Sequence, residues 1–209
     1  MRFPNNMLTI RKARLTDVPA LLALINDYAA RGVMLPRTEF ELCENLRDFM
    51  VAIETEDGEE ERIAGCGALH FYTTQTAEVR SLAVAERRKT AGVGKKIVAA
   101  LIEEARDFKL DIVFAFTYVV GFFEKCGFLV VDRGTLPLKA WKDCVRCPKF
   151  SCCDEIAVVY LLSPEALAHS QRTDVNLVEI QPLNANWSLS PEEPILMPMP
   201  AEGRGFQQR

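Results

Sequence analysis

The order of apolar and polar residues at the start of the chain predicts a strand followed by a helix. Residues 8–12 alternate apolar and polar side chains, as a half-buried strand does. Apolar residues then recur at helical spacing over 18–28. Thr16 and Asp17 offer side-chain oxygens that can cap the start of this helix, and Gly32 favours its end.

A second helix and two strands are predicted next. Thr38 and Glu41 have the spacing of a capping box, which predicts a helix from there through Phe49. Strands follow over 50–53 and 62–72, and the acidic, glycine-containing turn between them favours a hairpin.

The remaining pattern indicates an α/β fold. Residues 78–84 predict a strand and residues 93–108 a strongly amphipathic helix. Further elements are expected at residues 111–117 (strand), 120–125 (short helix), 128–131 (strand) and 156–162 (strand). Strands and helices in this order are typical of a mixed sheet flanked by helices.

The composition changes after this last strand. Residues 1–162 are expected to form one domain, whereas residues 163–209 are rich in Pro, Asn, Ser and Gln and show no lasting periodicity. Such a segment buries too little apolar surface to offset its ordering entropy, so it is predicted to be disordered or docked on a neighbouring subunit.

Charge and composition narrow the class of function. The chain of 209 residues has 25 Lys and Arg against 29 Asp and Glu, a net charge of -4 and a sequence pI near 5.4. No general attraction to nucleic acid or to an anionic membrane is expected. The sequence has neither a long apolar span nor an apolar signal core. We expect a cytoplasmic protein, with a closed homodimer as one possible assembly.

The most specific local feature is a glycine-containing basic turn between a predicted strand and the amphipathic helix. Glycine allows close approach of a ligand to the backbone, and a helix start presents unpaired N–H groups. Positive charge is concentrated here, which suits a ligand with several phosphates. The expected binding residues are Lys89, Thr90, Ala91, Gly92, Val93, Gly94 and Lys95, with Arg87, Arg88 and Lys96 adding charge.

The turn is open to other interpretations. It could be a plain tight turn followed by a solvated basic helix end. The nucleotide-triphosphatase motif Gly-x4-Gly-Lys-Ser/Thr and the dinucleotide motif Gly-x-Gly-x-x-Gly are both absent from it.

The turn resembles the acyl-CoA-binding turn of the GNAT acetyltransferases, Arg/Gln-x-x-Gly-x-Gly/Ala after a strand ending in Leu-x-Val. Residues 89–94 follow Leu82 and Val84 in this way, with Lys89 as a mild departure. Residues 122–128 resemble the second signature of the family, a short helix ending in Gly-Phe. The resemblance covers residues 8–162 and implies a mostly antiparallel twisted sheet of six to seven strands, splayed between residues 78–84 and 111–117.

A narrower resemblance is to the stand-alone enzymes related to N-acetylglutamate synthase. It rests on segments 34–37, 63–70, 78–84 and 113–117. It implies acetyl transfer from acetyl-CoA to the α-amine of a free amino acid, L-glutamate, through a ternary complex. That reaction is the first step toward arginine.

The resemblance also implies roles for particular residues. Glu78 stands where several relatives carry the general base, and main-chain N–H groups near Leu82, Ala83 and Val84 would stabilise the oxyanion. Many relatives have a tyrosine as the proton donor for the CoA thiolate, but this chain has Phe123 there, which is placed instead among the CoA-binding residues. Either the thiolate leaves without a dedicated acid, or another group such as Tyr118 or Cys66 donates the proton, and the sequence does not choose between them. Tyr118 is the candidate catalytic residue, and its alternative role is that of a packed aromatic.

Substrate carboxylates require cations, and the arginine fork matches them. Arg37, at the entrance to the second helix, and Arg80, on the strand face of Glu78, are the candidates, and Cys66 and Thr117 complete the expected pocket. Each arginine, like Glu78, could instead be an ordinary surface residue. His70 is expected to be a strand-face residue rather than a catalyst.

Four cysteines lie within ten residues: Cys144, Cys147, Cys152 and Cys153. The spacing of the first two suits zinc, but the adjacent last two do not complete a tetrahedral site without strain. No metal is predicted; free thiols in a substrate-covering loop are favoured over zinc or a reducible disulfide.

Two functions besides glutamate acetylation remain open from the sequence. The acceptor could be another amine, such as glutamine, a polyamine-like compound or a protein N-terminus. Alternatively, the chain could be a CoA-binding regulatory module without turnover, which the phenylalanine at position 123 would suit.

Overall fold

A computed structural model describes residues 7–55, 61–89, 91–132 and 152–163, together with residues 136, 144, 147 and 149. The C-terminal segment from residue 164 onward, the turn at 56–60 and Thr90 lie outside the described residues.

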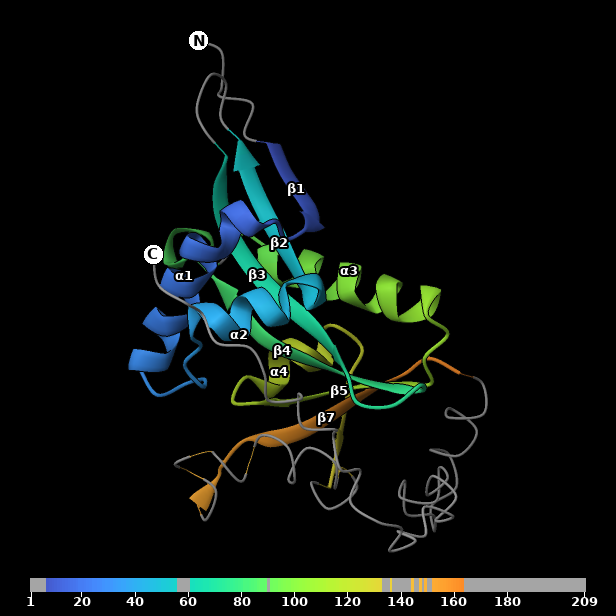
Figure 1. The fold of residues 1–209 in the computed structure, drawn as a ribbon. Coiled ribbons are helices and arrows are strands. Elements are labelled where there is room, and N and C mark those ends of the chain that lie inside the picture. Colours follow the sequence, from blue (N-terminus) through green and yellow to red (C-terminus); the bar gives the residue numbers. More distant parts are fainter. Residues whose placement is uncertain are drawn as a thin grey trace, which may run out of the picture.

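A seven-stranded mixed sheet forms the centre of the molecule, in the order β1-β2-β3-β4-β5-β7-β6 (Figure 1). Neighbouring strands are antiparallel except β4 and β5, which run parallel. The strands are β1 (Met7–Lys12), β2 (Phe49–Thr55), β3 (Arg62–Phe71), β4 (Thr76–Val84), β5 (Ile112–Thr117), β6 (Leu129–Val131) and β7 (Ile156–Leu161). The predicted sheet is thus confirmed.

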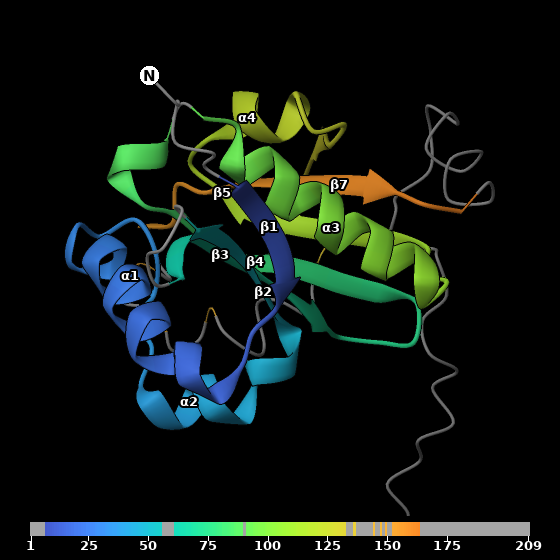
Figure 2. The ribbon, with the colours of Figure 1, turned by 90° about the horizontal axis from the view of Figure 1, so that it is seen from above.

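Helices cover both faces of the sheet (Figure 2). On one face lie α3 (Val93–Asp107) and α4 (Val120–Glu124), and on the other lie α1 (Val18–Ala30) and α2 (Glu39–Glu44). The apolar stripe of α3 packs on strands β1 to β4, as its periodicity predicted. Short 3-10 turns lie at η1 (Leu15–Asp17), η2 (Leu46–Asp48) and η3 (Glu86–Arg88).

The parallel pair β4 and β5 separates along its length. Pairing covers Thr76 to Glu78 on β4 and Ile112 to Phe114 on β5, whereas both strands continue beyond it. The second half of β4 therefore keeps its partner β3 on one side and has lost β5 on the other. The predicted splay is confirmed, and it begins at Glu78.

Two glycines in β3 let α3 lie close to the sheet. A Cβ atom on Gly65 would lie 2.9 Å from the Ala83 carbonyl oxygen and 3.0 Å from Ile97. A Cβ atom on Gly67 would lie 2.9 Å from Ile97. Side chains at these positions would push α3, and with it the turn before α3, away from the sheet.

Helix α2 is shorter than predicted. Its capping box is present, since the Glu41 N–H donates to the Thr38 hydroxyl at 3.2 Å and the Thr38 N–H to the Glu41 carboxylate at 2.9 Å. The helix nevertheless ends at Glu44, and Phe49 opens β2 opposite Ala68. The prediction of a helix through Phe49 was wrong because the ladder with β3 buries this ring as a strand residue.

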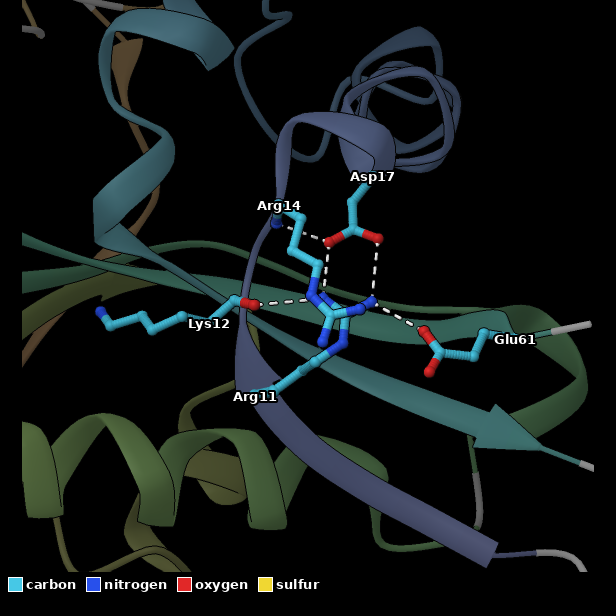
Figure 3. A network of polar contacts seen from close by, with 5 residues as sticks. All are labelled: Arg11, Lys12, Arg14, Asp17 and Glu61. Atoms are coloured by element: carbon cyan, nitrogen blue, oxygen red, sulfur yellow. Dashed lines mark hydrogen bonds and ion pairs between the residues drawn. The ribbon is translucent and has the colours of Figure 1, made fainter.

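Asp17 does not cap α1 as predicted. Its carboxylate accepts two hydrogen bonds from Arg11 of β1, at 2.7 and 3.1 Å, and one from the Arg14 N–H at 2.7 Å (Figure 3). Arg11 also donates to Glu61 beside β3 at 2.9 Å. We call Arg11, Asp17 and Glu61 the Arg11 network; it ties the edge strand to the start of the helical layer and to β3.

Within the described part of the chain, no helix has the length and apolar character that a membrane crossing requires.

Candidate active site

Glu78 lies at the point where β4 and β5 part. Glu78 is only 2% exposed, and its carboxylate accepts a hydrogen bond of 3.0 Å from the Tyr72 hydroxyl. Phe114 is its register partner on β5, and the Tyr72 ring lies 5.3 Å from that of Phe114. The Glu78 carboxylate thus lies where the splay begins, beside the aromatic rings of Tyr72 and Phe114.

A second polar group lies beside Glu78 on the same face of the sheet. His70 of β3 is the antiparallel register partner of Glu78, so the two side chains are neighbours across the ladder. The His70 Nδ1 lies 2.6 Å from Asp48 Oδ2 of η2. Arg80 Nη2 approaches the same Asp48 oxygen at 3.8 Å and Asn45 Oδ1 at 3.4 Å. We call Asp48, His70, Glu78 and Arg80 the β4 cluster.

Arg80 has polar partners that the sequence did not predict. Its side chain is 9% exposed and is directed to Asp48 and Asn45. The structure thus places this arginine beside Asp48 and Asn45, and binding of a substrate carboxylate by Arg80 stays a prediction.

A bulge follows Glu78 in β4. Between the pairs Ala68 to Arg80 and Cys66 to Ala83, β4 has two residues where β3 has one. Ser81 of the bulge has a φ of 52°, in the left-handed region. The bulge bends β4 at the start of its unpaired half, where acetyl transfer would require main-chain donors.

The amide of Val84 faces the side from which β5 has diverged. The Ala85 N–H donates to the Ala64 carbonyl of β3 at 2.8 Å. Successive strand amides point to opposite sides, so the Val84 N–H points away from β3. The Tyr28 hydroxyl of α1 donates to the Val84 carbonyl at 2.6 Å and holds this end of the strand in place.

Cys66 does not belong to the pocket. Its side chain is fully buried in the core beneath α1, and its thiol donates to the Ser81 carbonyl at 3.6 Å. Burial raises the pKa of the Cys66 thiol to about 12. The expectation of a substrate ligand or proton donor is corrected: the thiol is a small core group under the bulge.

The glycine turn presents main-chain donors at the start of α3. Gly92 is the N-cap with φ 74°, and a Cβ atom there would meet nothing within 4 Å. The first N–H groups of a helix have no partner within it, and glycine has no side chain to cap them. Val93 and Gly94 are buried, and Lys95 is exposed beside the turn. The turn is thus suited to bind phosphate through N–H groups.

Several cations of this turn have carboxylate partners. Arg88 contacts the buried Glu54 of β2, and Arg87 lies 3.4 Å from the same carboxylate. Lys89 donates to Glu86 at 2.7 Å, and this hydrogen bond raises the pKa of Lys89. Part of the positive charge of Arg87 and Arg88 is thus offset by Glu54, and their contribution to ligand binding stays a prediction.

Phe123 is a core residue. It is 4% exposed, and its ring packs edge to face with Phe122 at 5.3 Å and Phe128 at 5.0 Å. Phe122 is the ring nearer the turn, because a Cβ atom on Gly94 would lie 3.2 Å from it. The structure therefore places Phe122 beside Gly94 and buries Phe123, and the CoA contact of Phe123 stays a prediction.

Tyr118 follows β5 at the far side of the splay. Its hydroxyl accepts a hydrogen bond of 3.1 Å from Lys149, whose ammonium also donates to the Gly32 carbonyl at 3.2 Å. Burial raises the pKa of the Tyr118 phenol, as do the nearby carboxylates of Asp154 and Glu155, so it stays protonated at neutral pH. Thr117 is buried and accepts the Val119 N–H at 2.9 Å.

Arg37 lies on the segment between α1 and α2. Asn26 of α1 fixes its backbone at both polar atoms: the Asn26 amide donates to the Arg37 carbonyl, and the Arg37 N–H donates to Asn26, each at 2.9 Å. The arginine is half-buried. Asn26 thereby fixes the position of the Arg37 backbone.

The cysteine-rich segment lies largely outside the described residues. Among those residues, no group of three or more His, Cys, Asp or Glu side chains is placed to hold a metal ion. The Cys147 N–H donates to the Cys144 carbonyl at 2.9 Å, and Cys153 contacts Glu155.

Sequence reasoning missed Asp48, Tyr72 and Asn26. His70 lies in β3, as predicted, but its contact with Asp48 was not foreseen. This contact depends on register: Phe49 pairs with Ala68, which brings η2 beside His70. No local motif carries that information.

Comparison with known proteins agrees with this geometry. The model of the acetyltransferase (GNAT) family matches residues 21–128. An uncharacterised N-acetyltransferase of Chlorobaculum tepidum is 39% identical over 157 residues, covering 73% of this chain and 96% of that protein. The amino-acid acetyltransferase of Mycobacterium tuberculosis is 29% identical over 162 residues, covering 78% of this chain and 91% of the relative.

A crystal structure of an M. tuberculosis protein in complex with CoA has a similar fold. It superposes with a TM-score of 0.63 at 26% identity and covers 74% of this chain and 99% of that chain.

Proposed function

The chain belongs to the acetyltransferase (GNAT) family, whose co-substrate is acetyl-CoA, and we propose that it acetylates the α-amine of L-glutamate. The observation that carries this proposal is the buried carboxylate of Glu78 at the head of the splay, in a chain similar to an amino-acid acetyltransferase. In this proposal, acetylation of L-glutamate is the first step toward arginine.

The described residues suit both parts of acetyl-CoA. The turn around Gly92 offers main-chain N–H groups and open space for the phosphates. The unpaired half of β4 offers the Val84 N–H to the thioester arm, as a strand edge does. In this proposal the same amide stabilises the oxyanion of the tetrahedral intermediate.

Glu78 is proposed as the general base. It takes a proton from the substrate ammonium, and the amine then attacks the thioester carbonyl. A C–N bond forms, the C–S bond breaks, and the CoA thiolate leaves. Tyr118 is proposed to donate a proton to that thiolate, because its phenol is protonated at neutral pH. The second proton that the nitrogen loses as the amide forms restores the Tyr118 phenol.

Arg37 is proposed as the ligand of a substrate carboxylate. Its backbone is held by Asn26, and an arginine fork binds a carboxylate bidentately. Arg80 is engaged with Asp48 and Asn45, so the assignment rests on Arg37.

The test is a thiol-release assay with acetyl-CoA and each of the twenty amino acids, with a blank lacking acceptor. We expect clear preference for glutamate. Arg37→Ala should raise the KM for glutamate roughly 10- to 100-fold, the loss expected for a charge-assisted hydrogen bond, and leave the KM for acetyl-CoA unchanged. Arg47→Ala, an exposed arginine on η2, is the matched control.

Two results would overturn the proposal. Preference for glutamine or for a basic amine would keep the acetyltransferase and discard glutamate as its acceptor. No turnover with any amino acid, with CoA binding intact, would point to a macromolecular acceptor.

A further inference from the structure

Acetylation of an ammonium group produces protons that must leave a buried site. Of the two protons that the nitrogen loses, one can neutralise the CoA thiolate and one must reach solvent. Glu78 is 2% exposed, so its carboxyl has little direct contact with water. A more exposed neighbour would be needed to carry the proton outward.

His70 is such a neighbour. It is the register partner of Glu78, and its side chain is 12% exposed, with that of Asp48 at 18%. Its ring stands edge to face with Tyr72, the residue whose hydroxyl donates to Glu78, at 5.5 Å between centroids. The β4 cluster thus extends from the buried carboxylate toward the more exposed η2.

Asp48 decides which nitrogen of His70 can exchange protons. An ionised carboxylate only accepts hydrogen bonds, so the nitrogen 2.6 Å from it, Nδ1, carries the hydrogen. In the neutral ring Nε2 then carries the lone pair that can accept a proton. Arg80 Nη2 lies 3.8 Å from the same Asp48 oxygen, and the Asp48 carboxylate would stabilise an imidazolium beside it by charge attraction.

We propose that His70, oriented by Asp48, carries the proton from Glu78 to solvent during acetyl transfer. The inference rests on the proposed function of Glu78 as the base. His70 acts through Glu78 and does not contact the reacting atoms, so it is a positioning residue rather than a catalytic one.

The proton moves from the substrate to solvent in three steps. The substrate ammonium gives a proton to the Glu78 carboxylate and becomes a neutral amine. Protonated Glu78 gives that proton to His70 Nε2, which restores the carboxylate and forms an imidazolium. The imidazolium releases the proton to water. No oxidant, reductant or further co-reactant is required.

A purely structural role for His70 would be to tie η2 to β3, and isosteric variants separate the two roles. In His70→Asn the amide nitrogen can replace Nδ1 and keep the bond to Asp48, but nothing replaces Nε2. We expect kcat to fall about 100-fold, within the range of general acid–base groups, with Tm and the KM for acetyl-CoA unchanged.

His70→Ala provides a second readout. It removes the ring and leaves space beside Glu78, so imidazole in solution should restore part of the lost kcat in a concentration-dependent way. Glu103→Gln, which breaks an exposed ion pair on α3 on the other face of the sheet, is the control and should match the wild type.

The outcomes are distinguishable. Three results together support proton transfer through His70: the wild type turns over, His70→Asn is slow, and imidazole restores part of the activity of His70→Ala. An active His70→Asn variant, or loss of Tm without rescue, assigns the histidine to structure and overturns the inference. A wild-type protein without acetyl transfer would instead contradict the proposed function.

Discussion

The Arg11 network and the β4 cluster are built from similar parts and do different things. In the first, an arginine and a buried aspartate form two direct hydrogen bonds, and a second carboxylate completes the set. In the second, an aspartate holds a histidine, and the arginine lies farther from it. The first lies beside the edge strand β1, and the second lies where β4 and β5 part.

The difference is in which groups can exchange protons. Arginine stays charged at every accessible pH and Asp17 takes up a proton only in acid, so the Arg11 network holds structure together at neutral pH. A histidine titrates near neutral pH by nature, and the β4 cluster places one next to a buried carboxylate at a splayed strand pair. The same residue classes thus stabilise the fold in one place and are proposed to move protons in the other.

The largest expected effect is on the β4 cluster through Glu78→Gln. The amide can still accept the Tyr72 hydrogen bond but cannot take a proton, so kcat should fall about 10²- to 10⁴-fold with little change in Tm. Thiol release measures the rate, and calorimetry should show CoA binding at wild-type affinity. A variant with full activity would show that Glu78 is not the general base. The β4 cluster would then no longer differ from the Arg11 network by a role in proton transfer.

Asp17→Asn should lower stability and leave activity unchanged, the opposite of what is expected for Glu78→Gln. Removing the charge that pairs with Arg11 should cost about 2 kcal/mol of unfolding free energy, as hydrogen bonds between charged groups do. For a domain of this size that is a Tm decrease of about 4–8 °C. Activity at 25 °C should be unchanged. Asp27→Asn, which breaks an exposed ion pair in α1, is the matched control and should change stability by no more than about 0.5 kcal/mol.

Acid unfolding should distinguish the same two proteins. Partial burial alone would raise the pKa of Asp17, but the Arg11 hydrogen bonds outweigh it and hold this pKa below its usual value. The contribution of Asp17 is therefore complete above the unfolded pKa of about 3.9 and is lost as pH falls through the lower folded pKa. Urea midpoints measured from pH 6 to pH 2 should converge for wild type and Asp17→Asn at the acid end. Parallel curves would show that the Arg11 pair does not shift this titration.

The smallest expected effect is that of Tyr72→Phe. It removes one hydrogen bond to Glu78, a contribution of about 1 kcal/mol, so kcat should change about fivefold while the ring packing on Phe114 remains. Steady-state kinetics measure it. Phe71→Leu, at the neighbouring exposed position of β3, should leave kcat unchanged; an equal effect in both would assign the Tyr72 result to packing.

Much of the fold could be predicted because local patterns carried it. The stripe of α3, the alternation in β1 and the capping box at Thr38 are each set by residues within a few positions of one another. The prediction that α2 reaches Phe49 failed because pairing of that residue with β3 outweighs helix propensity.

The candidate site divides in the same way. Gly92 and the start of α3 were predicted from adjacent residues, and the structure has the left-handed turn that the glycine permits. Cys66, Phe123 and Arg80 were placed in the site by position along the chain. Register and packing turned the first two into the core and the third toward Asp48.

The amino-acid sequence alone determined the order of strands and helices and the glycine turn before α3, because each depends on short-range spacing. The splay between β4 and β5 was expected from the resemblance to a known family. Only the tertiary structure decided that Asp48 meets His70, that His70 faces Glu78 and that Glu54 takes up Arg87 and Arg88. These contacts join residues 8 to 34 positions apart through strand register, and which side chains meet depends on how the whole sheet pairs.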